Sequence, residues 1–194
     1  MFISFLQRNK FFRNIIYVLG KLRAHDMIDR IKPLLNKNDS ILDIGAGSCN
    51  ISEILEGSGY NVFPLDIQNL SFVDGINPII YDGITIPFDG DSFDKSLLLT
   101  VLHHTPNPEE ILDEAKRVSK NIIVIEDIYS NWFHRYITYF FDSLLNLEFF
   151  GHPHTNKTDY EWRTVFKNMN LILVEARYKR SFLIFRHATY FLTK

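Results

Sequence analysis

A pair of glycines directly follows a short apolar segment that has the pattern of a buried strand. The segment is Ile41–Ile44, and Gly45 and Gly47 lie between it and a helical stretch. Glycine lets the backbone approach a ligand closely, and the first N–H groups of the following helix can bind its polar atoms. Asp43 would repel a pyrophosphate but accept a hydrogen bond from an ammonium or hydroxyl group. The loop predicts a nucleotide-type cofactor that is uncharged or cationic here, against the alternative of an ordinary strand-to-helix turn.

Acidic residues recur at the ends of the next predicted strands. Asp66 follows the second strand and Asp82 the third. Because ligands of open α/β sheets bind at the carboxyl ends of the strands, we expect Asp43, Asp66 and Asp82 to line one crevice. Asp66 lies about 20 residues beyond the glycine loop, where an acidic side chain accepts hydrogen bonds from ribose hydroxyls. A dinucleotide-binding loop has Gly or Ala at position 50, so Asn50 disfavours NAD.

Strands and helices are predicted to alternate along the chain. Most strands are continuous apolar runs, which is typical of parallel strands covered on both faces, and a clear helical pattern follows Pro108 at 108–119. The last two strands are close enough in sequence to form a hairpin that adds an antiparallel strand. The predicted strands are 40–44, 61–66, 78–81, 95–101, 121–126, 171–178 and 182–192.

Further helices are predicted at the start of the chain and after the fifth strand. The first extends to about residue 35, and Pro33 disturbs its last turns. The apolar positions expected on one of its faces are Leu22, Ile28, Ile31 and Leu35. A long amphipathic helix with apolar side chains from Phe133 to Leu145 is interpreted as a lid, and a shorter helix follows at Asp159–Lys167.

These elements predict an α/β fold: a doubly wound, Rossmann-like sheet of seven strands, mostly parallel, with an antiparallel C-terminal strand, N-terminal helices and a helical lid insertion. We expect a single domain over 1–194. It comprises an N-terminal helical segment (1–37), a cofactor-binding half (38–127) and a part that holds the substrate-side helices and the closing hairpin (128–194).

Composition fits one globular domain in a reducing, cytoplasmic setting. The chain has 194 residues, 46% of them hydrophobic, and its one cysteine excludes an internal disulfide framework and most structural zinc sites. The N-terminus lacks the charged-then-apolar order of a signal peptide, and no run approaches a membrane span. Lys and Arg outnumber Asp and Glu by 8 to 3 in residues 1–39, are outnumbered by 15 to 4 in 40–127, and lead by 9 to 5 in 128–194. The basic flanks suit an anionic substrate or membrane surface, or are ordinary solvated surface, and their modest excess does not indicate nucleic-acid binding.

Several short motifs occur in the order found in one enzyme family. Over about residues 38–127 the chain resembles the class I S-adenosylmethionine-dependent methyltransferases, particularly the broad group with the ubiquinone and menaquinone biosynthesis enzymes. The motifs are Leu42–Gly47, Leu65–Ile67, Tyr81–Gly83, Ile86–Phe88, Ser92–Asp94, Val101–His104 and Glu114–Val118.

The resemblance implies S-adenosyl-L-methionine as cofactor and S-adenosyl-L-homocysteine as product. It implies that Asp66 binds the ribose, that Ile67 lies against the adenine and that Asp82 meets the adenine amino group. The cofactor-binding residues expected are Asp43, Gly45, Ala46, Gly47, Asn50, Asp66, Ile67, Asp82, Gly83 and Thr100. The chain departs from the family at Cys49, where a third glycine is usual, and at Ser119-Lys120-Asn121, where a longer turn usually precedes the fifth strand.

The implied reaction is direct methyl transfer, in which alignment matters most and a general base is optional. His103 and His104 are the candidate catalytic residues because imidazole titrates near neutral pH. Adjacent side chains at a strand end point in different directions, so we expect at least one of the two in the pocket. Glu126 is a candidate substrate contact, and the alternative for the end of this strand is that Asp127 or Ser130 caps the following helix. No metal site is expected.

Substrate recognition is expected outside the cofactor half. His104, together with His152 and His154 on a lid loop, could contact the substrate. Phenylalanines lie among basic residues near the N-terminus, which suggests a small, apolar or aromatic acceptor and contact with a membrane surface. Two alternatives stay open, a non-catalytic protein that binds the same cofactor as a sensor or partner subunit and an NAD-dependent oxidoreductase. The sequence does not indicate an oligomeric state.

Overall fold

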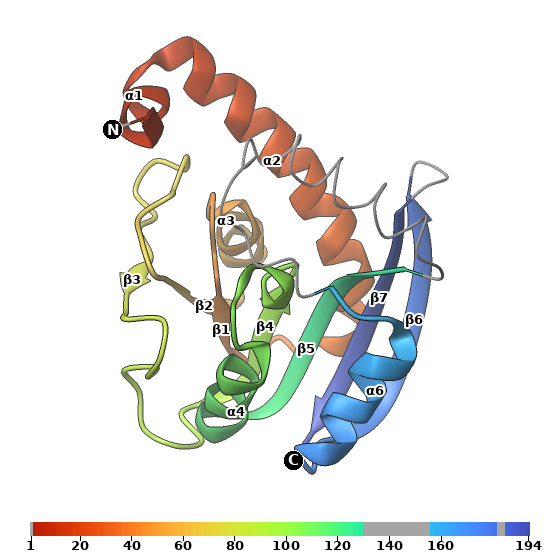
Figure 1. The fold of residues 1–194 in the computed structure, drawn as a ribbon. Helices are drawn as coiled ribbons and strands as arrows, with labels where there is room; N and C mark the ends of the chain where they lie inside the picture. Colours follow the sequence, from red (N-terminus) through yellow and green to blue (C-terminus); the bar gives the residue numbers. More distant parts are fainter. Residues whose placement is uncertain (1, 130–155, 182–184) are drawn as a thin grey trace.

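The computed structural model describes residues 2–129, 156–181 and 185–194 (Figure 1). Its elements are α1 (Phe2–Arg8), α2 (Lys10–Ile31), η1 (Lys32–Leu34), β1 (Ser40–Ile44), α3 (Asn50–Gly57), β2 (Asn61–Asp66), β3 (Ile79–Ile80), β4 (Phe93–Leu99), η2 (Leu102–His104), α4 (Pro108–Val118), β5 (Ser119–Ile128), α6 (Asp159–Asn168), β6 (Ile172–Ser181) and β7 (Phe185–Thr193).

Seven strands form one sheet in the order β3-β2-β1-β4-β5-β7-β6. The pairs from β3 to β5 are parallel, whereas β7 runs antiparallel to both β5 and β6. This confirms the predicted mostly parallel sheet with an antiparallel C-terminal strand. Because β1, β2, β4 and β5 point the same way, their carboxyl ends meet at one edge of the sheet.

Helices cover both faces of the sheet (Figure 1). On one face α2 and α3 bury Met27, Ile31 and Leu55 against the strands. On the other face α4 and α6 pack around Leu112, where Trp162 and other large side chains are fully buried. Burial on both faces explains why the strands read as continuous apolar runs.

The bounds of β3 to β7 each differ by one to three residues from the prediction, and those of β3, β4 and β5 have local reasons. β3 is only Ile79–Ile80, and β4 ends at Leu99 because Thr100 takes a left-handed backbone with φ of 59°. β5 begins at Ser119, directly after α4. The missing turn noted at Ser119–Asn121 is therefore at the amino end of β5, away from the carboxyl ends of the strands.

The N-terminal helical segment is broken at a residue that the prediction did not single out. The side chain of Asn9 accepts hydrogen bonds from the N–H groups of Phe11 and Phe12, at 3.1 and 3.4 Å, so Asn9 caps α2 and separates it from α1. Pro33 lies in η1, as its disturbing effect predicted. The expectation that Leu22 shares the buried face is wrong, because Leu22 is 65% exposed. Leu22 lies nine positions before Ile31, a spacing that places the two on opposite sides of a helix.

The predicted short helix is confirmed as α6, which begins with a capping box between Thr158 and Glu161. The predicted lid helix with Phe133 to Leu145, and also His152 and His154, lie outside the described residues. None of the helices in the described part of the chain is long and apolar enough to cross a membrane.

Candidate active site at the carboxyl ends of the strands

The glycine loop wraps around the carboxyl end of β1. Gly45 and Gly47 have φ of +72° and +49°, values that other residues rarely adopt. The N–H groups of Gly45 and Ala46 both donate to the carbonyl of Leu65, at 2.8 and 3.1 Å, which ties the loop to β2. A Cβ on Gly45 would lie 2.5 Å from a methyl carbon of Val101, so glycine is required there by contact as well as by conformation.

Cys49 is the last residue of the loop before α3 and also has a left-handed backbone, with φ of 60°. The position therefore keeps the conformation that favours the family's usual third glycine. Burial raises the pKa of the Cys49 thiol to about 12, so the side chain is a packing residue with little thiolate near neutral pH.

Asp66 joins the loop to the end of β2. Its Oδ2 accepts a hydrogen bond from the Gly47 N–H at 2.8 Å, and its Oδ1 accepts one from the Gln68 N–H at 3.3 Å. The structure thus brings together the two motifs that the sequence pairs as cofactor loop and ribose-binding carboxylate.

Asp43 lies beneath the loop, only 2% exposed. Its Oδ2 accepts a hydrogen bond from the Ser52 hydroxyl of α3 at 2.7 Å. Burial, reinforced by the nearby Asp66 and opposed by Ser52, raises the pKa of Asp43 to about 6. A cation bound beside this carboxylate would stabilise its charged form.

Gly83, with φ of +80°, forms an open apolar wall with Ile67 next to Asp66. A Cβ on Gly83 would come within 3.1 Å of the Ile67 side chain, which is itself 58% exposed. Oδ1 of Asp82 accepts hydrogen bonds from the N–H groups of Ile84 and Thr85, both at 2.8 Å, and these bonds lower the pKa of Asp82. Asp82 therefore holds its own turn, and its contact with an adenine stays a prediction.

Asn50, the first residue of α3, is buried against α2. A Cβ on Gly20 of α2 would lie 2.3 Å from Oδ1 of Asn50, so only glycine allows this close approach of the two helices. The Asn50 side chain also accepts a hydrogen bond from the Ser48 hydroxyl at 2.7 Å. Asn50 thus supports the loop from behind. Gly20 inside a helical pattern was the sequence signal that could have predicted this close contact between α2 and α3.

Thr100 marks the end of β4 with a strained backbone. A β-branched residue with φ of 59° is an outlier, and such strain is found at functional sites. Its N–H donates to the carbonyl of Ile125 at 2.7 Å, and its hydroxyl accepts a hydrogen bond from the Arg23 guanidinium at 3.0 Å. Arg23 was not predicted as a site residue, because no local pattern links α2 to a strand end 77 residues away.

His103 and Glu126 form a buried pair next to Thr100. Nδ1 of His103 lies 2.5 Å from Oε2 of Glu126, and both side chains are at most 1% exposed. Oε1 of Glu126 accepts a hydrogen bond from the Leu102 N–H at 2.8 Å. Both carboxylate oxygens of Glu126 are thus bonded within the protein, which favours a positioning role over the predicted substrate contact.

His104 lies beside His103, with ring centroids 4.0 Å apart. The expectation that the two side chains diverge is wrong, because both belong to the 3-10 helix η2 and not to a strand end. His104 is half-buried and His103 is buried, so His104 is the more accessible of the two.

A second His–carboxylate pair connects β5 and β7. Nδ1 of His187 lies 2.6 Å from Oδ1 of Asp127. Burial alone would raise the pKa of Asp127, but His187, with His103 and Arg23 nearby, lowers it below its usual range. The sequence did not predict this pair, because the two residues are brought together only by the antiparallel register of β5 and β7.

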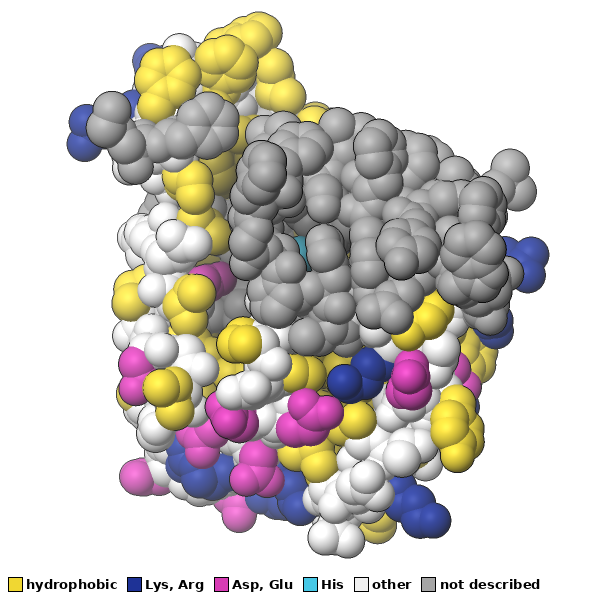
Figure 2. Space-filling view, viewed as in Figure 1, with side chains coloured by type: hydrophobic (Ala, Val, Ile, Leu, Met, Phe, Trp, Pro, Cys, Tyr) yellow, Lys and Arg dark blue, Asp and Glu magenta, His cyan; other side chains and the backbone are white. Residues whose placement is uncertain are grey.

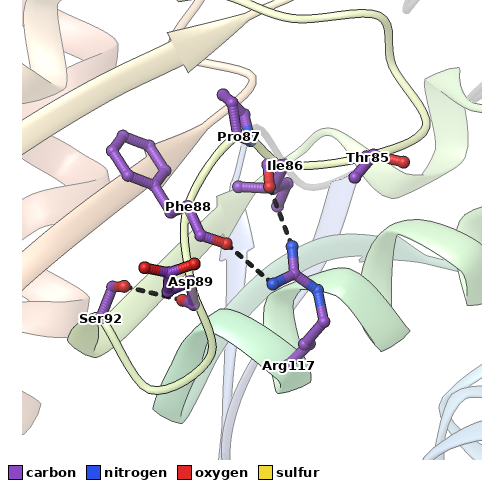
Figure 3. A pocket seen from close by; sticks show the side chains of 7 residues that line it. All are labelled: Thr85, Ile86, Pro87, Phe88, Asp89, Ser92 and Arg117. Carbon is purple, nitrogen blue, oxygen red and sulfur yellow. Dashed lines mark hydrogen bonds between the residues drawn. The ribbon is translucent and has the colours of Figure 1, made fainter.

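A cavity of about 460 Å³ lies elsewhere, where Arg117 reaches the segment before β4 (Figure 3). The Arg117 guanidinium is held by the Ile86 and Phe88 carbonyls and by Glu114. This cavity is at the amino ends of β4 and β5, away from the glycine loop.

A protein-family model described as a methyltransferase domain matches residues 42–122 of the sequence. This range includes the glycine loop, Asp66, Asp82 and His103. Residues 42–122 thus match a methyltransferase domain, and the fold is that of the class I S-adenosylmethionine-dependent methyltransferases. S-adenosylmethionine is the cofactor of such domains, and the carboxyl ends of the strands in this chain hold carboxylates, two glycines with a left-handed backbone and the apolar side chain of Ile67.

Solved structures agree with this fold. A putative methyltransferase from Bacillus halodurans is 13% identical, with a TM-score of 0.67 over 86% of this chain and 98% of that one. A SAM-dependent methyltransferase from Methanosarcina mazei is 21% identical, with a TM-score of 0.66 over 84% and 96%. An uncharacterized protein of Methanocaldococcus jannaschii is 46% identical over 46 residues, and this match spans 24% of the chain and about a fifth (22%) of that relative.

Proposed function

We propose that this methyltransferase transfers the methyl group of S-adenosylmethionine to a small, apolar or aromatic acceptor. The observation that carries the proposal is the hydrogen bond from the Gly47 N–H to Asp66 at the carboxyl ends of β1 and β2. It puts the loop that would hold the amino-acid part of the cofactor next to the carboxylate that would hold its ribose. The bound cofactor supplies an activated methyl group on a sulfonium sulfur.

Each residue around the crevice has a proposed task. Asp66 accepts the ribose hydroxyls, Asp43 favours the ammonium group, and Ile67 with Gly83 forms the wall for the adenine. Thr100, held by Arg23, lies at the end of β4 next to these groups in the proposed site. Contacts within the loop and between the helices hold these groups in place before the cofactor binds. Less entropy is then lost when the cofactor is oriented.

On the acceptor side we propose that His104 contacts the substrate while Glu126 and His103 hold η2 in position. His104 is close enough to the buried pair to be oriented by it. A proton lost by a phenol or similar acceptor could pass to this imidazole. His152 and His154 stay predicted substrate contacts.

The test is methyl transfer from methyl-labelled S-adenosylmethionine to a panel of phenols, quinols and aliphatic hydroxyl and amine compounds. Label in an apolar or aromatic acceptor, with equal release of S-adenosylhomocysteine, is the expected result. Label only in polar or charged acceptors would contradict the acceptor class. Tight cofactor binding without transfer to any acceptor would favour the sensor or partner-subunit alternative.

The pKa of Asp43 predicts how cofactor affinity depends on pH. Below pH 6 Asp43 holds a proton and offers no charge to the ammonium group, and above pH 6 it is a carboxylate. Affinity for S-adenosylmethionine is therefore expected to rise with pH, by about tenfold between pH 5 and pH 7. Calorimetric titrations across this range measure it.

Two controls separate Asp43 from other titrating groups. 5′-Methylthioadenosine has no ammonium group, so its affinity should change little with pH. The Asp43→Asn variant should bind S-adenosylmethionine with the same flat profile. A variant that keeps the wild-type slope would show that another group titrates.

A further inference from the structure

An apolar stripe runs along the outer side of α2. It consists of Phe11, Phe12, Ile15, Val18, Leu19 and Leu22, which are 41–68% exposed. The spacing of three, four and seven residues puts them on one helix face. Phe5 of α1, 54% exposed, lies next to Phe12, with ring centroids 6.1 Å apart. Figure 2 shows hydrophobic side chains gathered at this end of the molecule. We call these six α2 residues the outer stripe.

The opposite side of α2 is anchored to the domain. The Tyr17 hydroxyl donates to Glu53 of α3 at 2.8 Å, Gly20 lies against Asn50 of α3, and Ala24 and Met27 are buried. These contacts fix the rotation of the helix about its axis. The outer stripe is therefore turned away from the sheet by packing, and an exposed apolar surface of this kind marks an interaction site.

The charges around the stripe restrict its partner. Residues 2–25 hold no Asp or Glu, and their basic residues are Arg8, Lys10, Arg13, Lys21 and Arg23. Arg13 pairs with Asp74, and Lys21 pairs with Glu53. A two-fold contact with a second copy would still bring together two helical segments whose own side chains include basic but no acidic groups. An anionic lipid surface offers an apolar interior to the stripe and negative headgroups to its cations.

We propose that α1 and the outer stripe of α2 dock on an anionic lipid surface, with α2 lying in the plane of the interface. Arg23 follows the last stripe residue, Leu22, and reaches Thr100 at the end of β4. Docking in this way brings the carboxyl ends of the strands close to the lipid. The inference rests on the surfaces of α1 and α2 and is independent of methyl transfer.

Co-sedimentation with vesicles tests the proposal. The full chain is mixed with vesicles of phosphatidylcholine alone or of phosphatidylcholine with phosphatidylglycerol. The chain should sediment with the anionic vesicles, weakly with the neutral ones, and less as salt increases. The Leu19→Ser/Leu22→Ser variant should bind anionic vesicles about tenfold more weakly or worse.

The matched control is Ile172→Ser/Val174→Ser, which changes β6 side chains of similar exposure, 61% and 56% against 61% and 65% for Leu19 and Leu22. The control should sediment like the wild type, and titration with S-adenosylhomocysteine should show that both variants keep the wild-type site. A wild-type chain that stays in solution with anionic vesicles, or a stripe variant that binds them fully, would overturn the proposal. A third result would also overturn it: the wild type does not bind vesicles but forms a dimer in light scattering, and the stripe variant alone is monomeric. That result would assign the stripe to contact with a second copy.

Discussion

The Asp66→Ala variant is expected to lose on the order of 1 to 3 kcal/mol of binding free energy for S-adenosylmethionine and S-adenosylhomocysteine. The carboxylate is the proposed acceptor of the ribose hydroxyls, and it also accepts the hydrogen bond from the Gly47 N–H that holds the cofactor loop. Removing it deletes a ligand contact and loosens the loop at the same time. Calorimetric titration of the folded variant measures the loss.

Two comparison variants assign the effect. Asp66→Asn keeps an oxygen for the Gly47 N–H but loses the charge, so we expect an intermediate loss of affinity. Asp113→Ala removes an exposed carboxylate on α4 and should bind like the wild type. Unchanged affinity in a folded Asp66→Ala chain would show that the ribose is bound elsewhere.

The Glu126→Ala variant is expected to lower the free energy of unfolding by on the order of 3 to 5 kcal/mol, because it removes one partner of a buried pair. The carboxylate of Glu126 bonds to His103 and to the Leu102 N–H, and alanine leaves both buried groups without it. The loss should appear in urea unfolding followed by circular dichroism. Activity should fall as well, since η2 carries His104.

The Glu126→Gln variant keeps the shape of the Glu126 side chain but cannot carry its charge. Glu126→Gln retains an acceptor for the Leu102 N–H, so its loss of stability should be clearly smaller than that of alanine. Glu56→Ala, at an exposed position on α3, should stay within about 0.5 kcal/mol of the wild type. If Glu126→Ala were as stable as Glu56→Ala, the positioning role of Glu126 would be refuted.

The sheet was predictable because its strands are buried on both faces. β1 and β2 match the predicted ranges 40–44 and 61–66, and the spacing of the last two strands gave the β6–β7 hairpin. Helix breaks and strand ends were harder to predict from the sequence. Asn9 splits the N-terminal helix through its own side chain, and Thr100 ends β4 through a strained backbone that no residue preference predicts.

The cofactor side of the site was more predictable than the acceptor side. Gly45, Gly47 and Asp66 belong to short motifs whose spacing follows from strand and loop geometry, and the structure brings them together. Arg23–Thr100 and Asp127–His187 join residues 77 and 60 positions apart, so only the folded chain reveals them. Substrate recognition depends on such long-range contacts, which leave no local pattern in the sequence.

Calorimetric titration of the purified chain with S-adenosylhomocysteine, and in parallel with NAD, tests the central claim most directly. We predict saturable binding of one S-adenosylhomocysteine per chain and no heat from NAD, because the Asp43 carboxylate would accept the ammonium group of the first ligand and repel the pyrophosphate of the second. Binding of NAD without S-adenosylhomocysteine would contradict the assignment of the crevice to the adenosyl cofactor.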